Sequence, residues 1–322
     1  MRFLSILVFT FLGCNTYAQR STNPFFQKDS LIIVTKQPHK GFHHDYIIFI
    51  PKGTSLNTTT VLLVEPNNTG KITDSIEIHK EAAIRLASVS SVGNNCATEL
   101  KIPLLVPVFP RPASQPLLYT HALDRDVLLN QTPEYKRLDL QLLEMISDAE
   151  IRLVTLGIEI APKFFMSGFS ASGTFVNRFS LMHPKKIKAL AIGGFNGKLM
   201  LPIESLNGVD LNYPIGINDF SKLLEKNFDY TIFKEIPQYI YMGGLDTNDA
   251  VQFDDAYSKN ERKIINENLG KSVQERFVNC QNYYQEQGLA VTFKTFEKVG
   301  HWTTSEMNLE VIQFFLNELK KK

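Results

Sequence analysis

The sequence predicts an α/β fold in which a mostly parallel central sheet carries helices on both faces. Three observations favour it. Short apolar or β-branched runs alternate with segments of helical periodicity, as expected of βαβ units. No internal repeat or low-complexity tract interrupts this alternation. The 322 residues, 43% of them hydrophobic and 21% charged, suffice for one large core.

The first half of the chain is expected to supply three strands and two helices. The first strand stops at Pro51-Lys52-Gly53, and the second is rich in β-branched residues. Thr132 and Pro133 are typical of the start of a helix, and Gly157 is a residue that commonly ends one. The predicted strands are 45–50, 58–64 and 102–109, and the predicted helices are 75–87 and one from 132 to the residues before 157.

The second half continues the pattern around one irregular segment. Residues 196–235 contain several Pro, Gly and Asn residues, and they follow the sixth strand. We expect an insertion there, either a lid or pocket wall or an ordinary helical excursion. The predicted strands are 163–167, 188–192, 237–242 and 290–296, and the predicted helices are 172–182, 260–286 and 309–319.

The N-terminus has the layout of a secretory signal peptide. Arg2 precedes a short apolar run, and Thr16-Tyr17-Ala18 offers small residues for cleavage after Ala18. We therefore predict a signal peptide over 1–18 and a single domain over 19–322, secreted or periplasmic, with no transmembrane helix in the mature chain. A lipoprotein modified on Cys14 and an uncleaved anchor are the alternatives.

Charge and cysteine content exclude some functions and leave one question open. The formal net charge of +1, without a basic block, argues against a nucleic-acid partner. No cysteine pair has zinc-ligand spacing, so no metal site is expected. Export would permit a disulfide between Cys96 and Cys280, and two buried free thiols are the alternative.

The stretch from Phe164 to Gly173 places Ser170 where a strand turns sharply into a helix. Such a turn needs small neighbours, which Gly168 and Ser172 supply, and it directs free N–H groups of the helix toward an anion. The segment resembles the G-x-S-x-G nucleophile elbow of the α/β-hydrolase family, with Ser172 replacing the second glycine. The stretches PRP, LDRD, GFSASG and DTNDA are similar to those of uncharacterised predicted hydrolases.

The resemblance implies a chain order of nucleophile, acid and then histidine. His301 follows Gly300 near the end of the last strand and matches the histidine loop, whereas His183 is followed by Pro184 at a helix end. The turn after strand 237–242 resembles the family's G-x-x-D turn, which makes Asp246 the predicted acid and Asp249 the alternative. Ser170, Asp246 and His301 would form a catalytic triad.

The same resemblance implies an oxyanion hole with two backbone donors. The first is the N–H of Ala171. The second would come from Asn67 or Asn68, aided by an amide side chain, because residues 65–70 replace the usual His-Gly pair. Segment 119–126 is expected at the same sheet edge, as a cleft wall or a salt-bridge network.

These expectations combine into a serine hydrolase that cleaves a small-molecule or polymeric carboxylic ester through an acyl-enzyme, without a cofactor. The ester rests on analogy with secreted esterases and polyester depolymerases of this fold. A peptidase on the same fold and a non-catalytic binding protein are the alternatives.

Overall fold

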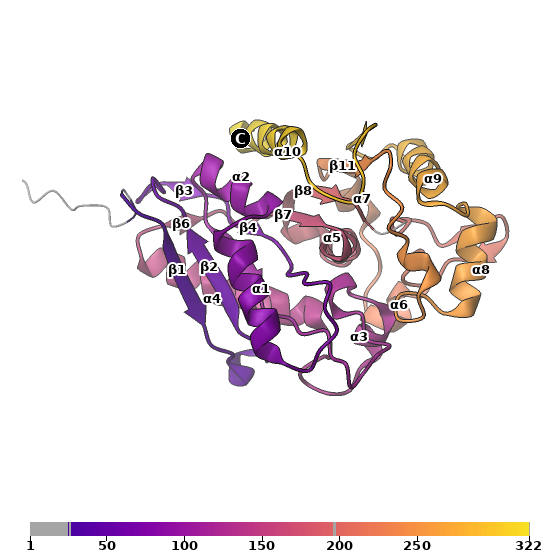
Figure 1. The fold of residues 1–322 in the computed structure, drawn as a ribbon, viewed down its shortest axis with the longest axis horizontal. Coiled ribbons are helices and arrows are strands. Elements are labelled where there is room, and N and C mark those ends of the chain that lie inside the picture. Colours follow the sequence, from indigo (N-terminus) through magenta and orange to yellow (C-terminus); the bar gives the residue numbers. More distant parts are fainter. Residues whose placement is uncertain (1–24, 26, 196–197, 322) are drawn as a thin grey trace, which may run out of the picture.

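The computed structural model describes residues 25, 27–195 and 198–321 (Figure 1). Its centre is an eight-stranded sheet in which β1 and β2 join the remainder by antiparallel pairing and all other neighbours run parallel. The predicted mostly parallel sheet is thus confirmed. In spatial order the strands are β1 (Ser30–Val34), β2 (Tyr46–Ile50), β5 (Leu104–Pro107), β4 (Leu63–Val64), β7 (Phe164–Phe169), β8 (Ile187–Gly193), β11 (Gln238–Gly243) and β12 (Val291–Phe296).

Helices cover both faces of the sheet and divide the interior into two cores. Successive strand residues point to opposite faces, so Ile47 belongs to one core and Ile48 to the other. One core includes side chains from α1 (Ile76–Ser88), α2 (Val92–Leu100) and α10 (Ser305–Lys320). The second includes side chains from α4 (Leu138–Thr155), α5 (Ala171–Met182), α8 (Lys259–Asn268) and α9 (Val273–Glu286).

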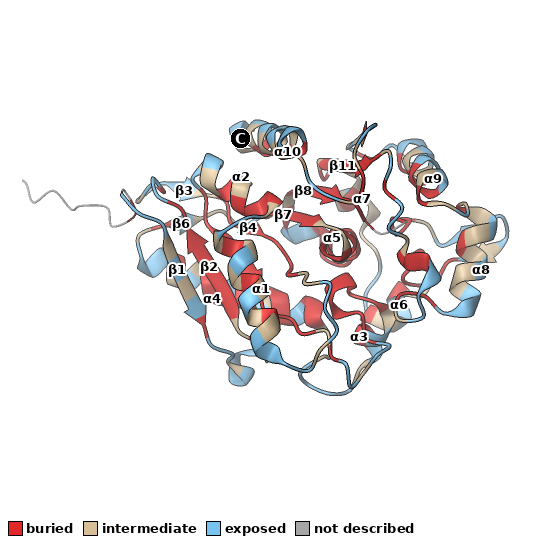
Figure 2. Ribbon diagram, viewed as in Figure 1, coloured by how far each residue is buried: buried red, intermediate tan, exposed pale blue. Residues whose placement is uncertain are grey.

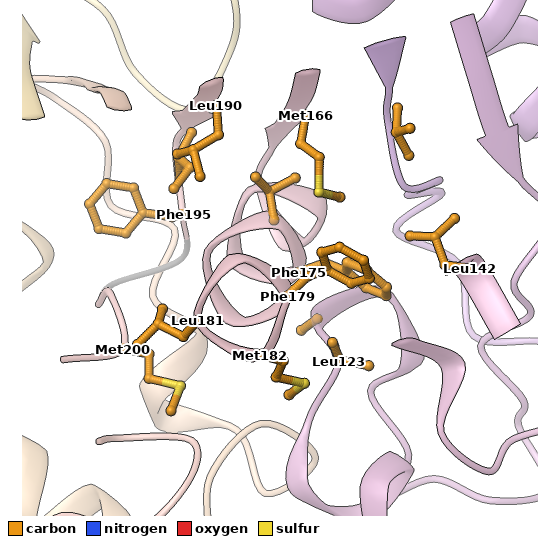
Figure 3. Close-up of a cluster of buried hydrophobic side chains, with 14 of the residues drawn as sticks. Leu123, Leu142, Met166, Phe175, Phe179, Leu181, Met182, Leu190, Phe195 and Met200 are labelled. Atoms are coloured by element: carbon orange, nitrogen blue, oxygen red, sulfur yellow. The ribbon is translucent and has the colours of Figure 1, made fainter. Parts of the chain in front are cut away.

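Helix α5 lies in the middle of the second core, and every one of its residues is buried (Figure 2). Phe175 and Phe179 extend from it toward Leu142 of α4, and Met166 of β7 and Leu190 of β8 lie on its sheet side (Figure 3). The buried polar side chains of α5 have partners within the protein: Asn177 donates to the Tyr284 hydroxyl, and Arg178 donates to the Ala122 carbonyl. The start of α5, which carries the elbow, is therefore held firmly against the sheet.

Two predicted helices differ from the structure for local reasons. Helix α4 begins at Leu138 rather than at Thr132, because the Gln141 side-chain amide donates to the carbonyls of residues 133, 134 and 136 and holds them in turns. The predicted helix 260–286 is two helices, separated at Gly270, whose φ of +115° does not belong to a helix. Strand β1 and helix α2 were not predicted.

The segment after β8 contains short elements and is largely packed onto the core. The main-chain N–H of Met200 donates to Asn177 of α5, and the Tyr284 hydroxyl donates to the Met200 carbonyl. The segment holds β9 (Ser205–Leu206), β10 (Val209–Asp210), α6 (Phe220–Leu224) and α7 (Tyr230–Lys234). Elsewhere lie β3 (Thr59–Thr60), β6 (Glu159–Ile160), α3 (Arg125–Leu129) and the 3-10 turns η1 (Pro38–Lys40), η2 (Thr120–Ala122), η3 (Pro184–Lys186) and η4 (Ala250–Gln252).

Cys96 and Cys280 are both buried free thiols, and they lie in different cores on opposite faces of the sheet. This answers the question that the sequence leaves open. The predicted signal peptide 1–18, with Cys14, lies outside the described residues. Among the residues that the structure describes, no helix combines the length and apolar character needed to cross a bilayer.

Candidate active site

Ser170 occupies a strained turn between β7 and α5. Its φ of 63° and ψ of −131° are rare for a residue with a side chain, and its main-chain N–H donates to the Gly193 carbonyl over 2.9 Å. Backbone strain of this kind costs about 1–3 kcal/mol and persists only where the surroundings enforce it. The turn places the Ser170 hydroxyl at the carboxyl edge of the sheet.

Small residues on both sides let α5 approach the sheet closely enough to form this turn. A Cβ at Gly168 would lie 2.4 Å from the Ser172 carbonyl oxygen, and one at Gly173 would lie 2.7 Å from the Gly193 oxygen. Ser172 is tolerated because its hydroxyl braces the turn: it donates to the Phe169 carbonyl over 2.8 Å and accepts from the Phe169 N–H over 3.0 Å. That hydroxyl is therefore engaged within the turn.

His301 and Asp246 lie in line with Ser170. His301 Nε2 is 2.9 Å from Ser170 Oγ, and His301 Nδ1 is 2.8 Å from Asp246 Oδ2. Asp246 is only 2% exposed, and its other oxygen accepts the main-chain N–H of Asn248 over 2.9 Å. The Phe169 ring packs against the imidazole, with 5.1 Å between ring centroids. The structure thus brings together three residues that are far apart in the chain.

Asp249, the alternative acid, has a different partner. Its carboxylate pairs with Arg276 of α9 over 2.6 Å and accepts the N–H of Val251 at the start of η4. Gln274, from the same helix, donates to the carbonyl of Asp246 over 2.5 Å. Helix α9 therefore anchors the loop that carries Asp246 at two points.

The loops that carry Asp246 and His301 are joined through their backbones. Gly244 N–H donates to the Phe296 carbonyl over 2.8 Å, and Leu245 N–H donates to the Val299 carbonyl over 2.9 Å. Only glycine permits this approach, because a Cβ at Gly243 would lie 2.2 Å from the Val299 oxygen. The distance between the carboxylate and the imidazole is thus set by two paired loops.

Asn248 is a site residue that the sequence did not single out. Its side-chain nitrogen lies 3.1 Å from His301 Nε2, close to the atom that also faces Ser170 Oγ. The only sequence signal is its position two residues after Asp246 in the same turn. An amide placed there can hydrogen-bond the imidazole or a group that enters the site.

The residues predicted for the oxyanion hole lie near Ser170. Ala171 is the first residue of α5, so its N–H has no acceptor within the helix. Asn67 is 1% exposed, and its amide is engaged by buried neighbours: Nδ2 donates to the Phe109 carbonyl over 2.8 Å and lies 3.4 Å from His121 Nε2, and Oδ1 accepts the Phe109 N–H over 2.9 Å. That side chain therefore orients the loop and leaves only a main-chain N–H, whereas Asn68 faces both cavities beside Ser170.

In the described part of the chain, Ser170 lines two cavities. The smaller, of about 560 Å³, lies toward α1 and includes Lys71, Glu81 and Arg85. The larger, of about 740 Å³, includes His301 and lies between the 68–72 loop, the 116–119 segment and η4. The described part of the 196–235 insertion contributes no residue to either cavity.

His183 lies at the opposite end of α5 from Ser170, about 18 Å away for a helix of 12 residues. Its Nε2 is 2.8 Å from Asp139, which also accepts two hydrogen bonds from Arg137. Burial alone would raise the pKa of Asp139, but the hydrogen bonds from Arg137 and His183 lower it well below its usual range. His183 is therefore hydrogen-bonded to the buried Arg137–Asp139 ion pair, which is remote from the site.

No protein-family model and no curated protein matches this sequence. Solved structures do. Poly(aspartic acid) hydrolase-1 from Sphingomonas sp. KT-1 matches 90% of this chain and 98% of its own length at 18% identity, with a TM-score of 0.55. An S-formylglutathione hydrolase from Agrobacterium tumefaciens matches 91% of this chain and 95% of its own length at 11% identity, with a TM-score of 0.51. At such low identity the likeness confirms the fold that the elbow sequence predicts, and shows the fold alone.

Proposed function

Since the chain has the α/β-hydrolase fold, we propose that it is a serine hydrolase that cleaves carboxylic esters. One observation carries the proposal: the hydrogen-bonded series from Asp246 through His301 to Ser170, with distances of 2.8 and 2.9 Å. A serine hydroxyl is a weak nucleophile until a base accepts its proton, and an imidazole needs a partner to hold its tautomer. His301 is placed to accept the proton of Ser170, and Asp246 is placed to hold the tautomer of His301.

In the first step the Ser170 oxygen attacks the ester carbonyl while its proton passes to His301 Nε2. Asp246 accepts the hydrogen bond from Nδ1–H and stabilises the imidazolium that forms. The carbonyl oxygen becomes an oxyanion between the N–H of Ala171 and a main-chain N–H of the 67–68 segment. Such a donor contributes about 3 kcal/mol to the transition state.

Collapse of the tetrahedral intermediate breaks the bond to the alcohol, which leaves with the proton from His301. Ser170 then carries the acyl group. In the second step His301 takes a proton from water, the hydroxide attacks the acyl carbon, and the carboxylic acid leaves as the proton returns to Ser170. The mechanism uses only side chains and main-chain donors of this chain, and requires no metal or organic cofactor.

We also propose that the chain is exported, as residues 1–18 suggest. Mass spectrometry of the N-terminus, after expression in a bacterium with a periplasm, tests this. A start at Gln19 in the periplasmic fraction supports it, and an intact Met1 in the cytoplasm contradicts it.

A fluorophosphonate probe and a panel of substrates test the hydrolase. We expect the native protein to be labelled on Ser170 and to hydrolyse short esters, and we expect the Ser170→Ala variant to do neither. Ser167→Ala is the matched control, since the hydroxyl of this nearby serine in β7 is buried without a hydrogen-bond partner among the described residues, and it should leave labelling in place. Faster cleavage of aminoacyl amides than of esters would indicate a peptidase, and absent labelling would favour a binding protein.

A further inference from the structure

We propose that the larger cavity binds the alcohol part of the ester, and that this part is a bulky apolar group, preferably aromatic. The inference rests on the proposed hydrolase function and assigns the substrate class of the same site. The cavity has a volume of about 740 Å³, which falls within the range typical of small-molecule sites. The cavity lies beside both Ser170 and His301, and exposed apolar side chains line it.

The orientation follows from the proton that the departing alcohol must receive. His301 Nε2 donates that proton, so the alcohol oxygen has to lie within hydrogen-bonding reach of the imidazole. Both cavities include Ser170, but among their described residues only the larger includes His301. An ester whose carbonyl carbon is at Ser170 therefore extends its alcohol into the larger cavity and its acyl group toward the smaller.

The walls of the larger cavity carry large apolar side chains that are left in water. Ile72, Leu117 and Phe253 are 51%, 55% and 61% exposed, and they come from three distant parts of the chain. Single exposed apolar residues are ordinary, but several that converge on one cavity beside a nucleophile indicate a binding surface. Tyr119, which is nearly buried, contributes a further aromatic surface.

The charged groups of this cavity are paired with protein partners. Arg111 forms an ion pair with Asp255, and its guanidinium lies 3.8 Å from the centre of the Tyr119 ring. Asp254 is paired with Arg262 over 2.6 Å. The Arg111–Asp255 pair is only 12–13% exposed, so it fixes the ring of Tyr119 and satisfies its own charges within the protein. A neutral, flat group that can stack on aromatic side chains fits these walls.

The smaller cavity differs in both size and polarity. It has a volume of about 560 Å³, and its walls mix apolar side chains such as Leu86 and Phe169 with the charged side chains of Lys71, Glu81 and Arg85. A bulky apolar acyl group placed there would remove water from several polar side chains without replacing their hydrogen bonds. The site is thus asymmetric in degree, with the larger and more apolar cavity on the side of the alcohol and a smaller cavity of mixed character on the side of the acid.

Two isomeric esters test this asymmetry directly. Benzyl acetate carries its ring on the alcohol, and methyl phenylacetate carries it on the acid. Both release an alcohol rather than a phenol. We expect kcat/KM to be about tenfold higher for benzyl acetate, the gain expected from burying a phenyl ring on one side only. Benzyl alcohol should inhibit the enzyme in competition with the ester.

Variants locate the ring. Phe253→Ala and Leu117→Ala are expected to lower the ratio of kcat/KM for benzyl acetate to that for methyl acetate about five- to tenfold. Leu309→Ala truncates a side chain that is 66% exposed on α10, and as the control it should leave the ratio unchanged.

The outcomes distinguish a failure of the proposed function from a failure of the inference about the alcohol. A preference for methyl phenylacetate, reduced by Phe253→Ala, would place the acyl group in the larger cavity and overturn the inference. Equal rates for the isomers, with no effect of either variant, would overturn it as well. If no ester is hydrolysed and the fluorophosphonate does not label Ser170, the proposed function fails and the inference falls with it. Labelling of Ser170 without the isomer preference refutes the inference alone.

Discussion

Asp246 and Asp249 are three residues apart in one turn, and the structure predicts opposite consequences for their replacement by asparagine. Asp246 contacts His301, whereas Asp249 pairs with Arg276, whose side chain is 0% exposed. Asp246→Asn keeps the shape of the side chain but can favour the wrong imidazole tautomer, so kcat should fall by about 10⁴. Asp249→Asn leaves a buried guanidinium without its ion pair, which costs about 3–5 kcal/mol.

The assay measures kcat with a short ester and Tm by circular dichroism on each variant. Asp246→Asn should lose its activity with little change in Tm. Asp249→Asn should keep kcat within about tenfold in the folded protein and melt roughly 5–15 °C lower. The double variant Asp249→Asn with Arg276→Met removes both charges and should recover part of the lost Tm. A collapse of kcat in Asp249→Asn at unchanged Tm, with an active Asp246→Asn, would refute the assignment of the acid.

Three further predictions concern stability and thiol chemistry. Gly168→Ala places a Cβ 2.4 Å from the Ser172 carbonyl oxygen. The free energy of unfolding, measured by urea titration, should therefore fall by about 3 kcal/mol, and the fluorophosphonate should no longer label Ser170. An unchanged urea midpoint would contradict this. Burial raises the pKa of Glu65 to about 8, so its contribution to stability is present below its usual pKa of about 4.5 and is lost as pH rises toward 8. The Tm of Glu65→Gln minus that of the wild type should therefore increase from pH 5 to pH 9. A difference in Tm that stays constant would contradict the raised pKa of Glu65. In a Cys14→Ser background, Ellman's reagent should react with Cys96 and Cys280 only after denaturation, because both thiols are buried and burial raises their pKa. Rapid reaction of the native protein would contradict the burial of these thiols.

The sheet and the elbow could be predicted because their signals are local. Apolar runs identify the buried strands, and the elbow around Ser170 needs small residues at positions that can be read directly. The positions of Asp246 and His301 after their strands then follow from the family's chain order. Each of these motifs can be read within a short stretch of the sequence.

Features that depend on distant partners could not be predicted. The ion pair between Asp249 and Arg276 on α9 cannot be read from the sequence, and the start of α4 is set by the side chain of Gln141. A main-chain N–H of Asn67 or Asn68 was expected as the second oxyanion donor, aided by an amide side chain, and the sequence does not show that the Asn67 amide is held by the Phe109 backbone. In each case a side chain finds its partner only once the chain has folded.

The pairing of the two loops that carry Asp246 and His301 has a consequence for how the site is lost. Hydrogen bonds from Gly244 and Leu245 tie one loop to the other, so the carboxylate and the imidazole share one rigid support. On heating, we expect that support to detach from Ser170 as a unit. Heat inactivation should accordingly proceed in a single step, together with faster hydrogen exchange at those two amides, and no partly active species should accumulate.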